Sequence, residues 1–130
     1  MPIEESHLVF ICGSALSGQP DNGNLAGAKF CGPVKTAAEY RMHSVENGWH
    51  PGVYETSNEG VSIAGELYEL SQKQFDFLAS TEPPHMYPAG IKLDDGRLAI
   101  AMLYPKELVE SNAWPDISEH GGWVVYKASN

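Results

Sequence analysis

The segment that most constrains the fold runs from Gly90 to Tyr104, where two apolar stretches flank Asp94-Asp95-Gly96. An Asp-Gly pair favours the tight turns whose twist matches that of two antiparallel strands. We therefore predict a β-hairpin with strands at residues 90–93 and 97–104. The second strand, RLAIAMLY, is apolar on both faces, which is typical of a strand in the middle of a sheet. We expect it to be central.

Other apolar stretches predict further strands. HLVFIC, at residues 7–12, is a short run of β-formers that ends at Gly13. Residues 28–36 and 39–45 are weaker strand candidates around Gly32-Pro33. The segment GVSIAGELYEL, at residues 60–70, alternates between two faces, with Val61, Ile63, Gly65 and Leu67 on one of them.

The helices expected are few and short. Ser71 precedes QKQFDFLAS with Gln74 three residues on, a capping-box pattern that satisfies free backbone N–H groups at a helix start. The two prolines after Glu82 forbid continuation of this helix. A second helix is predicted over PKELVESNA, with Pro105 in its first turn. A third begins near Asp116 and ends at the glycines before Trp123, which lets that side chain turn back onto the sheet in a structural role.

Many strands and few helices predict an α+β fold built on a small mixed or antiparallel β-barrel with peripheral short helices. Closure or strong curling removes the exposed edges that a small sheet otherwise leaves. The chain has 130 residues, of which 42% are hydrophobic and 19% charged, as in an ordinary globular domain. It contains no repeat, low-complexity stretch or long linker, so we expect one domain over residues 1–130.

Charge narrows the range of partners. The formal net charge is -9, and the eight Lys and Arg residues are scattered singly, which argues against nucleic acid and anionic membranes as partners. A small-molecule substrate is the remaining expectation. The first residues, MPIEESH, are acidic where a signal peptide is basic, and the longest wholly apolar run is LVFIC, far short of a membrane span. We expect a cytoplasmic protein.

Neither cysteines nor histidines have the spacing of a metal site. Cys12 and Cys31 are separated by eighteen residues and form no CxxC motif, so we interpret them as free thiols in strands. The five histidines show no HxxxH or HxH pattern. We therefore expect no metal and no cofactor.

The loop after the first strand is the first candidate site. ICGSALSGQPDNGNL, at residues 11–25, passes from an apolar strand into a polar loop with several glycines. Consecutive backbone N–H groups of Gly13, Ser14, Ala15 and Leu16 could hold a carboxylate or an oxyanion. The alternative is an ordinary turn at the end of a strand.

The order of these segments resembles the γ-glutamylcyclotransferase-like superfamily, whose fold is a small mixed β-barrel with peripheral helices. The residues that carry the resemblance are CGSAL, EYRM, GELYEL, STEPPHMY and DDGRLAIAMLY. Over nearly the whole chain the sequence is more closely similar to a free-standing allophanate hydrolase C-terminal domain, through SGQPDNGNL, TAAEYRM, HPGVYE, LDDGR and DISEHGGWVVY.

The resemblance implies different chemistry for the two families. In the cyclotransferases, a glutamate shortly after the helix acts as base and precedes a tyrosine, and the matching residues here are Glu82 and Tyr87. In allophanate hydrolase the loop carries a histidine that acts as base in breaking down N-carboxycarbamate, and Ala15 stands at that position. Cys12 replaces the tyrosine that opens the cyclotransferase loop.

Glu82 is the residue expected to carry catalysis. Burial raises the pKa of a carboxyl group toward neutrality, which suits it to take a proton from an attacking amine and return it to a leaving amine. The alternative is a solvated loop carboxylate. Arg41 is the candidate for binding a substrate carboxylate through its planar guanidinium group, or else forms a surface ion pair. Tyr87 and Tyr104 are expected to line the pocket, or else to pack as strand residues.

Three other residues near these positions have both a functional and a structural interpretation. Glu66 and Tyr68 either point toward the ligand or belong to the solvated face and the packing of their strand. His85 either carries protons beside Glu82 or is simply exposed.

Three functions remain open. The first is a cyclotransferase-type enzyme with Glu82 as general acid/base and the Gly13–Leu16 backbone as cradle. The second is processing of N-carboxycarbamate or a related small carboxylate. The third is a binding or accessory module without catalysis, consistent with Ala15 and Cys12. The substrate in each case is a small molecule that carries a carboxylate.

Overall fold

The turn at Asp94-Asp95-Gly96 joins β6 (Tyr87–Lys92) to β7 (Leu98–Leu103) in an antiparallel hairpin. The Leu93 N–H donates to the Arg97 carbonyl at 2.8 Å, and Gly96 adopts a φ of +90°, a left-handed conformation that suits glycine. The predicted hairpin is therefore confirmed, with a three-residue connection between Leu93 and Arg97.

The computed structural model describes residues 6–13, 15–19, 21–25, 27–46 and 48–128. The described residues form a five-stranded mixed sheet of order β2-β5-β1-β7-β6 and a two-stranded sheet of β3 and β4. The remaining strands are β1 (Ser6–Ile11), β2 (Lys29–Lys35), β3 (Tyr40–Val45), β4 (His50–Glu55) and β5 (Ala64–Ser71). The α-helices are α1 (Gln72–Ser80), α2 (Lys106–Asn112) and α3 (Trp123–Ala128), and single 3-10 turns cover Asn22–Leu25 and Ser118–His120.

This arrangement confirms the predicted α+β class. β7 lies between β1 and β6, so the prediction of a central strand is also confirmed. β1 is antiparallel to β5, with Val9 opposite Tyr68, and parallel to β7, with Val9 opposite Ile100. None of the helices in the described residues has the length and apolar character needed to span a bilayer.

The five-stranded sheet curls until its two edge strands touch at one end. Thr36, just after β2, forms an antiparallel bridge with Leu93, just after β6. Hydrogen bonds from the Ala37 N–H to Lys92 and from the Asp94 N–H to Lys35, at 2.9 and 3.0 Å, flank this bridge. In the described residues β2 and β6 share no longer ladder than this, so the sheet approaches a barrel without forming a continuously closed one.

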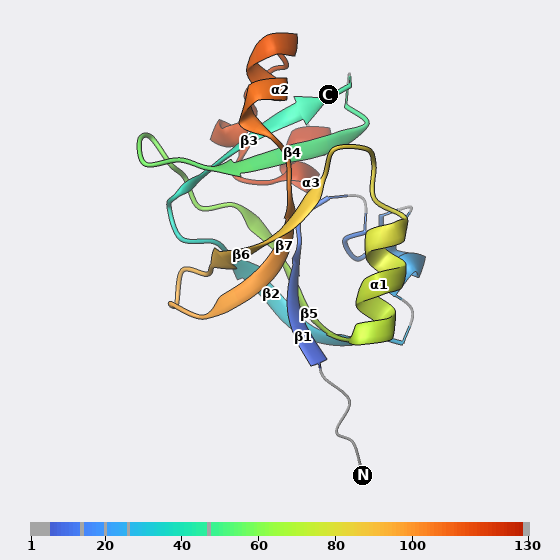
Figure 1. Cartoon of the computed structure of the whole chain (residues 1–130). Coiled ribbons are helices and arrows are strands. Elements are labelled where there is room, and N and C mark those ends of the chain that lie inside the picture. Colours follow the sequence, from blue (N-terminus) through green and yellow to red (C-terminus); the bar gives the residue numbers. More distant parts are fainter. Residues whose placement is uncertain (1–5, 14, 20, 26, 47, 129–130) are drawn as a thin grey trace.

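Both faces of the sheet are covered. The β3–β4 hairpin crosses one end of the five-stranded sheet, and α1 lies beside β1 and β5 (Figure 1). The main core cluster brings Phe10, Met42, Leu67 and Trp123 together. A second cluster places Val9 of β1 with Leu78 of α1 and others. Adjacent residues of β1 therefore point into different cores, as expected for a strand buried on both faces.

The local signals around the helices have mixed outcomes. α1 has the predicted capping box, in which Ser71 Oγ accepts from the Gln74 N–H at 3.1 Å and Gln74 Oε1 accepts from the Ser71 N–H at 2.8 Å. Pro105 is the residue before α2 and not part of its first turn. Trp123 is only 3% exposed, which supports its structural role, but it also begins α3, a helix that the sequence did not predict.

Candidate functional site

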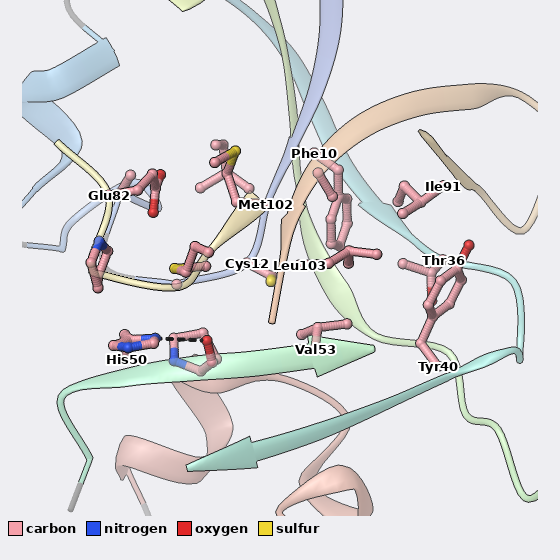
Figure 2. A pocket seen from close by; sticks show the side chains of 17 residues that line it. Phe10, Cys12, Thr36, Tyr40, His50, Val53, Glu82, Ile91, Met102 and Leu103 are labelled. Carbon is pink, nitrogen blue, oxygen red and sulfur yellow. Dashed lines mark hydrogen bonds between the residues drawn. The ribbon is translucent and has the colours of Figure 1, made fainter. Parts of the chain in front are cut away.

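A pocket of about 60 Å³ lies inside the curled sheet, where the loop after β1, the start of β4 and the segment after α1 converge. One end is apolar and is lined by residues such as Phe10 and Val53. Glu82 and His50 lie at the other end, on opposite sides of the pocket, and Cys12 lies between the two ends (Figure 2). A cavity of this size admits several waters or a small ligand.

A wider depression of about 340 Å³ adjoins this end of the pocket. Ala15, His50, Glu82 and Pro83 line both cavities and therefore form the boundary between them. On its outer side the depression is bordered by other residues, including Asp21 and Trp49. The inner pocket and the outer depression therefore adjoin each other at Glu82 and His50.

Glu82 follows directly on the C-terminus of α1. The Thr81 N–H donates to Leu78 at 3.1 Å and the Glu82 N–H donates to Ala79 at 3.3 Å, so the turn that ends the helix fixes the backbone of Glu82. Burial, and to a smaller extent the charge of Asp21, raises the pKa of Glu82 from 4.5 to about 7. Near neutral pH both protonation states are populated, which is what a general acid/base requires.

The loop after β1 forms one wall of the pocket, but only in part as predicted. Gly13 and Ala15 line the pocket, whereas Ser14 lies outside the described residues. Leu16 is buried in the cluster under α1, and its N–H donates to the Gly13 carbonyl at 3.1 Å. The Leu16 N–H is therefore engaged in a turn, and Leu16 does not line the pocket.

Cys12 lines the pocket and packs against the main core cluster. Burial, with the charge of Glu82 adding to it, raises the pKa of the Cys12 thiol to about 12. Since only a thiolate is strongly nucleophilic, Cys12 stays an unreactive thiol near neutral pH. Cys12 therefore forms part of the pocket wall and does not transfer protons.

Arg41 does not reach the pocket. Its guanidinium group binds the Asp116 carboxylate, with Nη2 at 2.6 Å and Nε at 3.2 Å from Oδ2, and Nη1 donates to the Glu59 carbonyl at 2.7 Å. The surface ion pair, which was the alternative interpretation, describes Arg41 in this structure. The Arg41 guanidinium group already binds a carboxylate of the chain, and Arg41 does not line the pocket.

The two tyrosines also lie outside the pocket lining. Tyr87 is 42% exposed and borders a separate depression beside Tyr54 and Lys106. Tyr104 is buried, and its ring lies 5.6 Å from the ring of His50. Tyr104 therefore supports a residue of the pocket without lining it.

The remaining candidates have local partners. Glu66 Oε1 accepts from the Ser17 N–H at 2.8 Å and from the Tyr68 hydroxyl at 3.0 Å, which ties the loop after β1 to β5. His85 is exposed, with its ring 6.3 Å from that of Tyr104. Neither Glu66 nor His85 lines the pocket.

His50 also lines the pocket, although nothing in its sequence context predicts a site. It is 4% exposed, and its Nδ1 donates to the Pro51 carbonyl at 3.0 Å. Burial lowers the pKa of its imidazole, although the bond to Pro51 and the charge of Glu46 act in the opposite direction. The motif HPGVYE carries this residue, but a histidine without a second ligand nearby gives no local signal of a site.

Comparison with known proteins gives a consistent result. The sequence profile described as the allophanate hydrolase C-terminal domain matches residues 7–128. No curated protein matches the chain. A solved structure of a uropathogenic E. coli-specific protein is similar, with 29% identity, a TM-score of 0.88 and coverage of 95% of this chain and 97% of that one.

Two further structures are similar at lower identity. Kluyveromyces lactis allophanate hydrolase has 18% identity and a TM-score of 0.88 over 96% of this chain, which spans only 21% of that protein. An AIG2-like protein from Mus musculus has 18% identity and a TM-score of 0.69, with 79% of this chain and 82% of that chain covered. At these identities the likeness shows the fold alone.

Proposed function

Because the chain belongs to the allophanate hydrolase C-terminal domain family and has a γ-glutamylcyclotransferase-like fold, we propose that it is a small-molecule enzyme of γ-glutamylcyclotransferase type. Glu82 is its general acid/base, and the backbone of the loop after β1 holds the acyl group. The observation that carries the proposal is the position of Glu82, with its pKa of about 7, in the pocket that Gly13 and Ala15 help to line.

The proposed reaction needs no co-reactant. The α-amino nitrogen of a γ-glutamyl amine attacks the γ-carbonyl carbon, a new C–N bond closes the lactam ring, and the C–N bond to the amine breaks. Glu82 takes a proton from the attacking nitrogen and returns it to the leaving nitrogen, so one carboxyl group serves both steps. The negative charge on the carbonyl oxygen in between is where backbone N–H groups stabilise the transition state.

The test is turnover of a panel of γ-glutamyl amines, followed as release of pyroglutamate. Glu82→Gln keeps the shape of the side chain but cannot accept a proton, so turnover should fall by about a hundredfold or more while substrate affinity stays close to wild type. Glu69→Gln, on β5 and outside the pocket lining, is the matched control and should retain turnover. Full turnover by Glu82→Gln would exclude this mechanism.

A second candidate is breakdown of N-carboxycarbamate, which the family match over residues 7–128 favours. In that reaction one carboxylate leaves as CO₂ and the nitrogen takes up a proton. Ala15 cannot supply a proton, but Glu82 and His50 both stand at the pocket boundary. Release of CO₂ and ammonia from this compound, without lactam formation on the first panel, would favour this candidate. Ligand binding with no turnover of either kind would identify an accessory module.

A further inference from the structure

His50 is held in one orientation by three neighbours. Its Nδ1 donates to the Pro51 carbonyl at 3.0 Å, and because a carbonyl only accepts, this bond places the ring proton on Nδ1. The Trp49 ring stands edge-on at 5.1 Å, and the Tyr104 ring lies tilted at 5.6 Å. In the neutral ring, Nε2 is left with a lone pair and acts as a hydrogen-bond acceptor.

That acceptor belongs to a residue that lines two cavities. Within the described residues Nε2 of His50 has no hydrogen-bond partner, whereas every fully buried side-chain nitrogen or oxygen there has one. Nε2 is therefore not sealed in the protein. His50 lines both the inner pocket and the outer depression, on the β4 side opposite Glu82 (Figure 2).

The surroundings of His50 select the type of group that can bind it. The described residues that line the two cavities include no lysine or arginine. The charged side chains there are Glu82 in both cavities and Asp21 in the outer one. An anionic group placed beside His50 would lack a counterion and would face a carboxyl group, whereas an N–H group could donate to Nε2.

We infer that His50 is a substrate-binding residue whose Nε2 accepts a hydrogen bond from an uncharged N–H group of the ligand, of the amide, lactam or urea type. The ligand spans the pocket boundary between His50 and Glu82. A carboxylate elsewhere on the ligand would be held by the loop backbone and not at this end. The inference rests on the proposed function, because it takes the pocket beside Glu82 as the substrate site.

Two substitutions separate binding by Nε2 from a structural role. His50→Asn places an amide N–H near the position of Nδ1, so it can keep the bond to Pro51 but has nothing at the position of Nε2. His50→Gln places its amide near the position of Nε2 and gives up the Pro51 bond. A purely structural role predicts that Asn is the better replacement, whereas binding through Nε2 predicts that Gln is.

The test uses pyrrolidinone, an uncharged lactam, as the probe and acetate as the anionic control. Binding of pyrrolidinone should shift the imidazole nitrogen resonance of Nε2 in the wild-type protein, and acetate should not. Loss of one hydrogen bond should weaken pyrrolidinone binding about tenfold in His50→Asn, and His50→Gln should retain most of the affinity. Melting temperatures of both variants report on folding, and the resonance test does not depend on either variant.

Failure of this inference is distinct from failure of the proposed function. If pyrrolidinone does not bind, or binds without a change at Nε2, or if acetate shifts Nε2 equally, His50 does not have this role. If Nε2 responds as expected but no γ-glutamyl amine is turned over, the ligand class stands and the cyclotransferase activity does not.

Discussion

Gly13 lies directly against Pro51, so close that a Cβ added to Gly13 would stand 3.0 Å from Cδ and 3.1 Å from Cγ of the proline ring. This contact packs the loop after β1 against the second residue of β4. Gly13 and Pro51 both line the pocket, so this contact joins two of its walls.

Gly13→Ala should push the loop and β4 apart. The proline ring is buried and rigid, so we expect a loss of about 1 to 2 kcal/mol in the free energy of unfolding, together with weaker pyrrolidinone binding. Gly23→Ala is the control, because a Cβ on Gly23 meets nothing within 4 Å. Urea unfolding of both variants checks the expectation, and equal stability of the two would contradict it.

The protonation of Glu82 should be visible in the stability of the protein. The native carboxyl group has a pKa of about 7 against an ordinary value of 4.5, so between these values the folded chain binds more protons than the unfolded chain. Stability contributed by this group is therefore present at low pH and is lost as the pH rises toward and past the native pKa.

Glu82→Gln removes this dependence because its amide does not titrate. Between about pH 4 and about pH 8, the free energy of unfolding should shift in favour of the variant by about 1 to 3 kcal/mol, after allowance for partial exposure. Asp21→Asn removes the smaller cause of the raised pKa and should give a smaller shift. A difference between Glu82→Gln and wild type that stays constant with pH would show that the native carboxyl group titrates normally.

The two cysteines should react at very different rates with iodoacetamide. Cys31 is exposed on the edge strand β2, whereas burial and the charge of Glu82 keep Cys12 protonated. In the native protein at about pH 8, alkylation should modify Cys31 first and Cys12 only on unfolding. Peptide mass spectrometry after a short exposure measures this order. Comparable native rates at both positions would contradict the shielding of Cys12.

Arg41→Gln should affect stability and leave ligand binding unchanged. The side chains of Arg41 and Asp116 are 25% and 37% exposed, so removing the ion pair should cost about 0.5 to 1 kcal/mol at neutral pH. Although burial acts the other way, hydrogen bonds from Ser118 and Arg41 hold the pKa of Asp116 below its ordinary value.

The contribution of the Arg41 pair should therefore shrink as the pH falls through the lowered pKa of Asp116. Urea unfolding at neutral and acid pH, beside pyrrolidinone binding, tests both expectations. A tenfold loss of pyrrolidinone affinity without loss of stability would show that Arg41 takes part in ligand binding.

The parts of the fold that were predictable depend on short-range signals. The Asp95-Gly96 hairpin and the Ser71–Gln74 capping box are each specified by residues a few positions apart, and both are present. β4 was missed because Pro51 and Gly52 interrupt the strand pattern. That glycine is required by tertiary packing, since a Cβ on Gly52 would stand 2.8 Å from Cγ2 of Val45.

The candidate site shows the same limit. Glu82 and Gly13 could be named because motifs in the right order surround them, and the structure lines one pocket with both. The partner of Arg41 lies 75 residues away in the chain, so no local pattern announces that its guanidinium group is already bound. His50 is a candidate site residue only because it lies opposite Glu82. That position is a property of the folded chain.

The exposed Trp49 is an intrinsic fluorescent probe beside the outer depression. Trp49 is 56% exposed, borders the outer depression and stands against the ring of His50, whereas neither the half-buried Trp114 nor the buried Trp123 lines that depression. A molecule that passes from solvent toward Glu82 changes the polarity around this indole first. We therefore expect the tryptophan fluorescence of the unlabelled protein to change when a compound fills the depression.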